Sequence, residues 1–233
     1  MTAILTYDFD QADWGSQKIF DDGGLSGKWD VDKVVIHYGG NGNFAGDALR
    51  AADRGYEYPS VKAEMAVLRI YEQSHLSRGW RAIGYNYAVG QSGKIYRLRG
   101  ENASGATSGD FDNDGIPENN EARAILWIGG LGQTPTEAAL RSIAQLIADD
   151  PRLVTVHSDH KSTGCPGDPL REWALRRGWE DYAGQVTTNP DFQQHWDDAV
   201  ATGFFSSFTH PTDIVTAEKL AVFFGRVGFF DEL

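Results

Sequence analysis

Two histidines and the chain's single cysteine lie close together in the stretch VTVHSDHKSTGCPGDPL, residues 154–170. Imidazole nitrogen and thiolate sulfur are common zinc ligands, and a catalytic zinc takes three protein ligands and keeps a fourth position for water. His157 ends an apolar segment, and Cys165 follows after seven intervening residues. A loop of this length can fold back and present both side chains, so a third ligand must come from another part of the chain.

His37 is the best candidate for that third ligand. It stands at the end of the apolar segment VVIH, which predicts a buried strand opening into a loop at Gly39 and Gly40. Neighbouring strands that end at one edge of a sheet bring their last residues together, so we expect His37 beside His157. The sequence therefore predicts a zinc site formed by His37, His157 and Cys165.

A cysteine hydrolase is the alternative among enzymes, with Cys165 as the nucleophile and His157 as its base. Thiol nucleophiles usually stand at the N-terminus of a helix, where the thiolate is stabilised. The residues around this thiol, TGCPG, instead predict a turn, and the hypothesis gives His37 no role. A metal site accounts for all three side chains.

Apolar segments typical of strands alternate with segments of helical periodicity. We expect strands within residues 32–40, 82–100, 122–130 and 152–157, with a hairpin at 91–93, and helices within 59–79, 134–150 and 168–178. Ser60 can cap the first helix. Thr134 is the expected cap of the second, with Pro135 in its first position and Glu137 completing a capping box. The pattern predicts an α/β fold, a central mixed β-sheet flanked by helices.

The composition changes after about Tyr182. A linker-like segment, AGQVTTNP, precedes short helical pieces around Phe192–Ala201 and Ala217–Val227, in a region rich in phenylalanine. We therefore expect residues 1–182 to form the main domain and residues 183–233 a small helical unit, near the lower size limit for folding alone.

The acidic segment DFDNDGIPENNE, residues 110–121, matches the spacing of a calcium-binding loop in full. Its acidic side chains would repel one another without a cation, although the flanking residues do not predict the two helices of an EF-hand. Calcium would order the loop rather than take part in chemistry. The expected ligands are Asp110, Asp112, Asp114, the carbonyl of Ile116 and Glu121.

The chain is acidic, with a net charge of −12 and a pI of about 4.8. Nucleic acid or an anionic membrane would require a basic face, so neither is expected as a partner. A single cysteine excludes an internal disulfide. The first residues lack the features of a secretory signal, and no stretch approaches the roughly 18 apolar residues of a membrane span. We expect a monomer that is synthesised in the cytoplasm without a signal peptide.

Three segments, VVIHYGG, GWRAIGYNYAVGQSGKIYRLRG and HSDHKSTGCPG, resemble in order and spacing the zinc-dependent N-acetylmuramoyl-L-alanine amidases of type 2. That family includes phage amidase endolysins and the peptidoglycan-recognition proteins. The resemblance covers about residues 10–178, and the H…CPG segment is its most specific part. It implies that His37, His157 and Cys165 bind zinc. Recognition proteins that do not hydrolyse peptidoglycan have typically lost the cysteine, which is present in this chain.

The resemblance also implies roles for residues around the metal. Tyr85, and Thr163 two residues before the cysteine, match catalytic residues that position the substrate and stabilise an oxyanion. Asn86 is expected to hold local structure or to touch substrate. Two positions depart from many relatives. Leu126 replaces a glutamate base, as in the phage-lysozyme-like branch, and Ala106 replaces a histidine.

Three further polar residues are given supporting or peripheral roles. His160 follows His157 by three residues and is expected to face solvent. Asp159 is expected to support the site through hydrogen bonds. His75 is expected to be a structural or surface residue.

The expected activity is zinc-dependent hydrolysis of the amide between N-acetylmuramic acid and L-alanine in bacterial peptidoglycan. The protein would be a phage endolysin or a virion-associated lysin that acts on the cell wall. A cytoplasmic muropeptide-recycling amidase and a non-catalytic peptidoglycan-binding module are the alternatives. Residues 183–233 are weakly similar to helical modules that bind cell surfaces, and the alternative is that they pack on the amidase domain.

Overall fold

The computed structural model describes residues 7–19, 31–40, 60–101, 103–105, 107, 109, 114–130, 132–148 and 153–182. The chain separates into two units, residues 1–182 and 183–233, and all described residues belong to the first. The helical pieces expected within residues 183–233 therefore lie outside the described residues.

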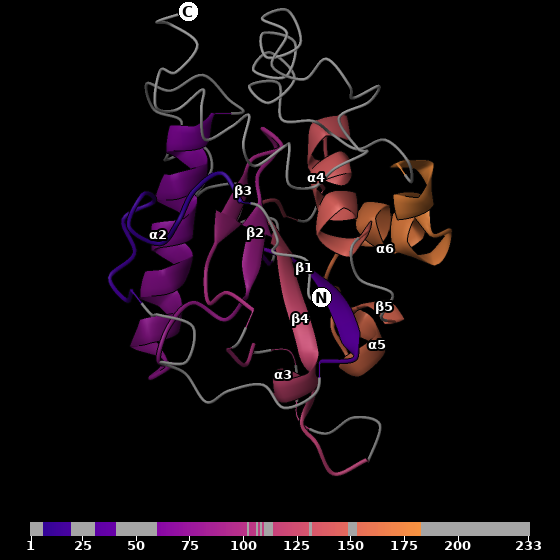
Figure 1. Ribbon diagram of the computed structural model, residues 1–233, viewed down its shortest axis with the longest axis horizontal. Helices are drawn as coiled ribbons and strands as arrows, with labels where there is room; N and C mark the ends of the chain where they lie inside the picture. Colours follow the sequence, from indigo (N-terminus) through magenta and orange to yellow (C-terminus); the bar gives the residue numbers. More distant parts are fainter. Residues whose placement is uncertain are drawn as a thin grey trace, which may run out of the picture. The chain divides into compact units, whose positions relative to one another are not determined.

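A mixed five-stranded sheet forms the centre of the first unit (Figure 1). Its strands are β1 (Lys33–Tyr38), β2 (Tyr87–Val89), β3 (Ile95–Arg97), β4 (Ala122–Trp127) and β5 (Leu153–Val156), in the order β3-β2-β4-β1-β5. The β2–β3 hairpin is antiparallel, whereas β1, β2, β4 and β5 pair in parallel. Every residue of β1 and β4 is buried, as expected for parallel strands covered on both faces. The predicted α/β class is confirmed.

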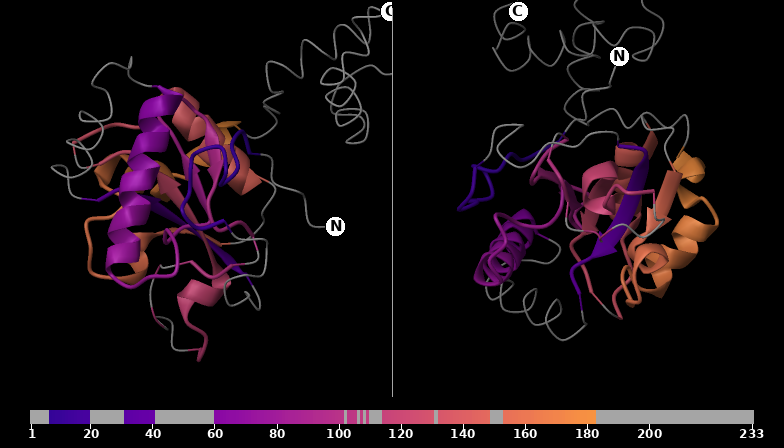
Figure 2. Two further views of the ribbon diagram at one scale, coloured as in Figure 1. Left: turned by 90° about the vertical axis from the view of Figure 1, so that its left-hand side faces the viewer. Right: turned by 90° about the horizontal axis from the view of Figure 1, so that it is seen from below.

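Helices cover both faces of the sheet (Figure 2). On one face, α2 (Val61–Ser77) packs through Val67 and Leu68 against Leu126 of β4. On the other face, α4 (Glu137–Ala148) and α6 (Asp168–Leu175) share a core with Ile36 of β1 and with Val156 of β5. Side chains alternate along a strand, so His37 projects from the opposite face to Ile36. That face is the one covered by α2.

The helix caps test the sequence predictions at single residues. The Ser60 hydroxyl accepts a hydrogen bond from the Ala63 backbone N–H, so the predicted cap of α2 is confirmed. The predicted cap of α4 was wrong by two residues. Thr136, not Thr134, accepts from the Ala139 N–H, and the N–H and hydroxyl of Thr136 both donate to Gln91.

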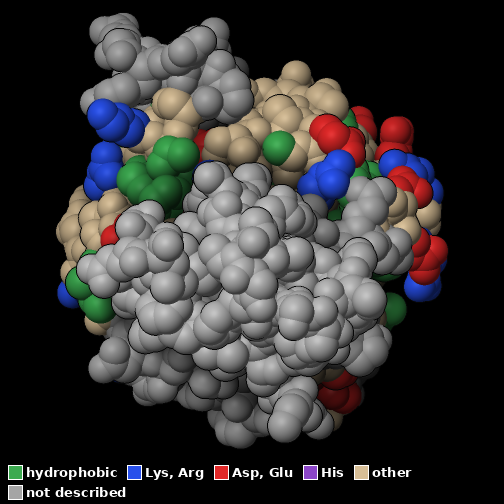
Figure 3. All heavy atoms as spheres, turned by 45° about the horizontal axis from the view of Figure 1, so that its top comes forward, with side chains coloured by type: hydrophobic (Ala, Val, Ile, Leu, Met, Phe, Trp, Pro, Cys, Tyr) green, Lys and Arg blue, Asp and Glu red, His purple; other side chains and the backbone are tan. Residues whose placement is uncertain are grey.

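Two four-residue helices stand next to the sheet, one between the acidic segment and β4 and one between β5 and the loop that leads to Cys165. Helix α3 (Glu118–Glu121) leads directly into β4, and α5 (His157–His160) directly follows β5. At the end of the unit, the 3-10 helix η1 (Gly178–Tyr182) follows α6. Acidic and basic side chains are interspersed at the right-hand side of Figure 3. Two ion pairs near the end of the unit link Arg176 to Asp181 and Arg177 to Glu180. No helix in the described ranges is long and apolar enough to cross a membrane.

Candidate metal centre and active site

Parallel pairing of β1 with β5 places two histidines side by side. The register matches Ile36 with Val156, so the next residues along the two strands are His37 and His157. Their ring centroids lie 4.4 Å apart. His37 is almost completely buried, whereas His157 is partly exposed at the start of α5. The expectation that His37 and His157 lie side by side at the ends of neighbouring strands is therefore confirmed.

Cys165 completes a three-residue cluster. Residues 161–164 form an exposed loop that returns the thiol to the sheet, where the Cys165 carbonyl accepts from the Ser158 N–H over 2.9 Å. The Cys165 Sγ lies 3.9 Å from His37 Nδ1 and accepts a hydrogen bond from the Tyr38 N–H over 3.3 Å.

The donor set fits zinc in type and spacing. One atom from each of His37, His157 and Cys165 can be chosen so that all three lie within 4.8 Å of one another. Ligands on one tetrahedral zinc stand roughly 3.3–3.6 Å apart, because zinc–nitrogen and zinc–sulfur bonds measure about 2.0 and 2.3 Å. Shortening the longest of these separations by about 1.2–1.5 Å at most would close the set around one ion.

Burial sets the protonation of these groups. It lowers the pKa of His37 well below the ordinary value, with further lowering by His157 and then His160. Burial likewise lowers the pKa of His157. Burial raises the pKa of the Cys165 thiol to about 12, against a smaller lowering by the Tyr38 N–H. Both imidazoles are therefore neutral at pH 7, as metal ligands must be, and a divalent cation would favour the thiolate.

Thr107 contacts both histidines, a role that sequence analysis missed. The His157 Nε2 lies 2.8 Å from the Thr107 carbonyl oxygen, and the His37 Nε2 lies 3.4 Å from the Thr107 hydroxyl. The only sequence signal was the departure noted at the preceding position, Ala106, which lies outside the described residues. Thr107 itself is buried.

Tyr85 and Thr163 lie next to the cluster from two different loops. The Tyr85 ring stands 5.2 Å from that of His37, between centroids, and burial raises the pKa of its phenol above the ordinary value. Tyr85 therefore keeps its proton at pH 7 and can act as a hydrogen-bond donor. The Thr163 hydroxyl accepts from the Cys165 N–H over 3.3 Å, on the exposed loop before the thiol.

Two neighbouring positions are fully buried. Leu126 pairs in register with His37 and is fully buried, so no proton-transfer group stands there. Asn86 is also fully buried. Its amide donates to the carbonyls of Gly100 and Ala103 and accepts from the Ala124 N–H. Asn86 thus has one of its two expected roles, holding local structure, and its contact with substrate stays a prediction.

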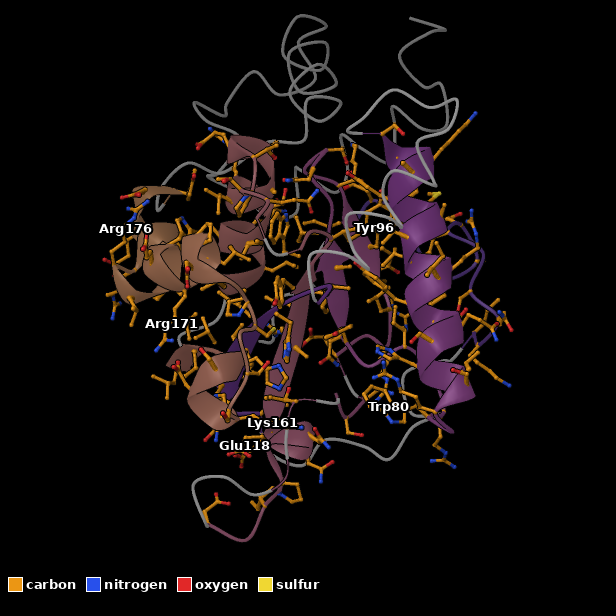
Figure 4. All side chains as sticks on the ribbon, turned by 180° about the vertical axis from the view of Figure 1, so that it is seen from behind. Trp80, Tyr96, Glu118, Lys161, Arg171 and Arg176 are labelled. Atoms are coloured by element: carbon orange, nitrogen blue, oxygen red, sulfur yellow. The ribbon has the colours of Figure 1, made fainter. Side chains whose placement is uncertain are left out.

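His160 was wrongly expected to face solvent. It is only 8% exposed, with Nε2 2.7 Å from the Thr155 hydroxyl and Nδ1 3.7 Å from a carboxylate oxygen of Glu118. Glu118 and Lys161, the residue after α5, lie at the same end of the sheet (Figure 4). The Asp159 carboxylate accepts from the Val156 N–H at the start of α5, and its support of the metal site stays a prediction.

The candidate calcium loop is described in part. Asp110 and Asp112 lie outside the described residues. Asp114 is exposed and accepts from the Ile116 N–H over 2.8 Å. Glu121 is buried in an ion pair with Lys33 of β1, so its carboxylate would have to leave that lysine to bind calcium. Calcium binding stays a prediction from the motif.

Comparisons with known proteins agree with this geometry. The family model described as N-acetylmuramoyl-L-alanine amidase, Amidase_2, matches residues 27–168. Peptidoglycan-recognition protein SC1a of Drosophila melanogaster is 28% identical over 189 residues, which cover 76% of this chain and 88% of the relative. The N-acetylmuramoyl-L-alanine amidase of Mus musculus is 28% identical over 136 residues, 54% of this chain and 23% of the relative.

The fold has the same relatives. The crystal structure of peptidoglycan recognition protein-LE, in complex with tracheal cytotoxin, superposes with a TM-score of 0.57 at 24% identity, covering 72% of this chain and 92% of that one. Because the family model spans more than half of the chain, including His37, His157 and Cys165, the chain belongs to the Amidase_2 family of N-acetylmuramoyl-L-alanine amidases.

Proposed function

We propose that the chain is a zinc-dependent N-acetylmuramoyl-L-alanine amidase, which hydrolyses the amide between N-acetylmuramic acid and L-alanine in bacterial peptidoglycan. The observation that carries the proposal is the convergence of His37, His157 and Cys165, three zinc-type donors from distant parts of the chain. Two neutral imidazoles and one thiol leave a tetrahedral ion one further position, as in catalytic zinc sites.

Zinc, when bound, supplies a water activated at neutral pH and polarises the carbonyl of the scissile amide. The protein's own groups orient and stabilise. The Tyr85 phenol, held protonated by burial, donates a hydrogen bond to the oxygen that gains negative charge. The Thr163 hydroxyl accepts from the Cys165 N–H, which fixes its oxygen and leaves its hydrogen to donate to substrate. Leu126 cannot accept a proton, so no base acts from that position.

Peptidoglycan as the substrate is supported by the relatives. The relatives from Drosophila are named for peptidoglycan recognition, and the LE protein was solved with a monomeric diaminopimelic acid-type peptidoglycan. We extend this class of ligand to the present chain through its family membership.

A non-catalytic peptidoglycan-binding module is the second candidate, favoured by the names of those relatives. The complete donor set and the neighbouring Tyr85 favour hydrolysis, because binding alone requires neither.

The deciding experiment is digestion of purified peptidoglycan followed by mass spectrometry of the soluble products. Zinc-loaded protein is expected to release stem peptides that begin with a free L-alanine amine, and a chelator or Cys165→Ser is expected to stop the release. Binding to peptidoglycan without such peptides would support the non-catalytic module instead.

We propose further that the protein works as a phage endolysin or virion-associated lysin, with residues 183–233 binding the cell wall. The support is the family resemblance together with the aromatic residues of that segment. Sedimentation with purified cell walls should retain the full chain more strongly than residues 1–182, at similar activity on soluble muropeptides. Equal retention would instead favour a recycling amidase acting on muropeptides.

A further inference from the structure

Thr107 is the one described residue that contacts both candidate ligand histidines through hydrogen-bonding atoms. Its carbonyl oxygen lies 2.8 Å from His157 Nε2, and its hydroxyl lies 3.4 Å from His37 Nε2. The two contacts use different parts of the residue. A substitution of the side chain can therefore remove the contact with His37 while the backbone contact with His157 remains.

The Thr107 carbonyl selects the tautomer of His157, and the Thr107 hydroxyl, which can accept as well as donate, can accept from the same tautomer of His37. A carbonyl oxygen only accepts hydrogen bonds, so a neutral His157 must carry its hydrogen on Nε2, which leaves the lone pair on Nδ1. For His37, it is Nδ1 that faces the Cys165 Sγ, at 3.9 Å, while Nε2 faces the Thr107 hydroxyl. Donation from Nε2 to that hydroxyl again leaves the lone pair on Nδ1, on the side of the thiol.

The backbone around Thr107 is held from several sides. The Asn86 amide donates to the Ala103 carbonyl over 2.8 Å, and the Arg99 guanidinium donates to the carbonyls of Ser104 and Gly105. The Gly105 N–H donates to the Asn119 carbonyl over 2.8 Å. Arg99 also donates to the Ala82 carbonyl, in the loop that leads to Tyr85. Residues 103–105, shortly before Thr107, are therefore held by hydrogen bonds from several sides.

We propose that Thr107 is a positioning residue of the metal centre, which orients His37 and His157 so that both present Nδ1 to zinc. The inference rests on the proposed zinc function and adds a residue to it. Hydrogen-bonded partners of ligand histidines fix the tautomer and the ring orientation, and their removal typically lowers metal affinity 10- to 100-fold, as a rough guide.

The test is zinc affinity of the full chain, measured by competition with a chromophoric chelator. Thr107→Val keeps the shape and the backbone carbonyl but loses the hydroxyl, and is expected to bind zinc about tenfold more weakly than the wild type. Thr107→Ser restores a hydroxyl and is expected to recover most of that loss. Equal affinity of the Val variant and the wild type, within twofold, would overturn the proposal.

A matched control separates affinity from stability. Thr136→Val makes the same chemical change at the start of α4, where the hydroxyl accepts from the Ala139 N–H, away from the metal cluster. It is expected to lower stability through loss of the cap and to leave zinc affinity unchanged. If Thr136→Val weakened zinc binding as much as Thr107→Val, the effect would be a general loss of stability and the proposal would fail.

Heteronuclear NMR of the histidine ring nitrogens in the zinc-loaded wild type tests the same proposal without any variant. Both ligand histidines should carry hydrogen on Nε2 and bind zinc through Nδ1. Zinc bound to Nε2 of either ring would contradict the proposal. Tight zinc binding without release of stem peptides would refute only the proposed amidase, and a wild type that failed to bind zinc would refute both.

Discussion

Two buried polar clusters lie beside the sheet, and they differ in the partners that their polar groups have. The metal cluster consists of His37, His157 and Cys165. The α3 cluster consists of two buried pairs, Lys33 with Glu121 and His160 with Glu118. In the α3 cluster Lys33 forms an ion pair with Glu121, and His160, whose pKa is lowered by burial, faces the Glu118 carboxylate as a hydrogen-bonding group. Among the described residues, the metal cluster contains three neutral donors and no partner of opposite charge.

The two clusters contain histidines that are close in sequence, His157 in the metal cluster and His160 in the α3 cluster. His157 and His160 belong to the same short helix, yet one turns toward a second histidine and a thiol and the other toward a hydroxyl and a carboxylate. Uncompensated donors that converge in a buried place are what a metal ion requires. Compensated pairs serve the structure. Proximity to a ligand in the sequence therefore does not make a histidine a ligand.

Removal of a donor should break the metal cluster and produce the largest effect. Cys165→Ser is expected to reduce bound zinc from about one ion per chain to a small fraction and to abolish peptidoglycan hydrolysis, because zinc then keeps only two strong ligands. His160→Gln, in the α3 cluster, should keep about one zinc. Metal content of dialysed protein by atomic emission checks both variants. Loss of zinc in His160→Gln would place that histidine in the metal centre and contradict the distinction.

Removal of one charge should destabilise the α3 cluster without affecting the metal. Lys33→Met leaves the Glu121 carboxylate buried without its partner, which typically costs about 3–5 kcal/mol in the free energy of unfolding. Lys94→Met is the matched control, because that lysine pairs with Asp8 near the surface and should cost less than about 1 kcal/mol. Urea unfolding measures both. If both variants lowered the free energy of unfolding by similar amounts, burial of the ion pair between Lys33 and Glu121 would make no difference to its contribution.

Tyr85→Phe should separate chemistry from metal binding. The aromatic ring beside His37 is retained and only the hydroxyl is lost, so zinc content should not change. The rate of stem-peptide release should fall about 10²- to 10³-fold, the usual effect of losing one oxyanion donor. Tyr96→Phe removes a hydroxyl bonded to Glu64, outside the metal cluster, and should leave the rate within about twofold. An undiminished rate in Tyr85→Phe would remove Tyr85 from the catalytic residues.

A third buried histidine, His75, belongs to neither cluster and gives the smallest expected effect. Its Nδ1 accepts from the Gly84 N–H, and its pKa is lowered from 6.5 to about 4 by burial, then by Arg78 and Arg99. The unfolded chain therefore takes up this proton first as the pH falls. Stability from neutral His75 is fully present above pH 6.5 and is lost toward pH 4, by up to about 3 kcal/mol.

The measurement for His75 is the free energy of unfolding as a function of pH, in the wild type and in His75→Gln. The wild type should lose more stability than the variant between pH 6.5 and 4. Parallel pH profiles would mean that His75 does not titrate as its burial indicates.

The central elements and the donor set were accessible from the sequence because each depends on local pattern. Apolar runs predicted the buried strands, and the shared edge of parallel strands placed His37 beside His157. The supporting contacts depend on tertiary structure instead. Thr107 contacts both histidines from a distant part of the chain, shortly after residues 103–105, which Asn86, Arg99 and Asn119 bind. No short-range pattern encodes these hydrogen bonds.

The errors have the same origin. Thr134 and Thr136 are equivalent by propensity, and the choice between them is made by Gln91, about 45 residues earlier in the chain. His160 lies in a polar stretch of sequence that is typical of a surface loop. It is nevertheless buried, because Glu118 and Thr155 provide it with partners. Glu121 occupies the last ligand position of the acidic motif, yet Lys33 lies within bonding distance of it. In each case a partner distant in sequence decides the environment.

X-ray absorption spectroscopy at the zinc edge tests most directly whether these three side chains hold one ion. The zinc-loaded chain should show one sulfur at about 2.3 Å and about three nitrogen or oxygen neighbours at about 2.0–2.1 Å, consistent with Cys165, two imidazoles and one position left for water. The sulfur should disappear in Cys165→Ser. A spectrum of the wild type with only nitrogen and oxygen neighbours would contradict the proposed centre.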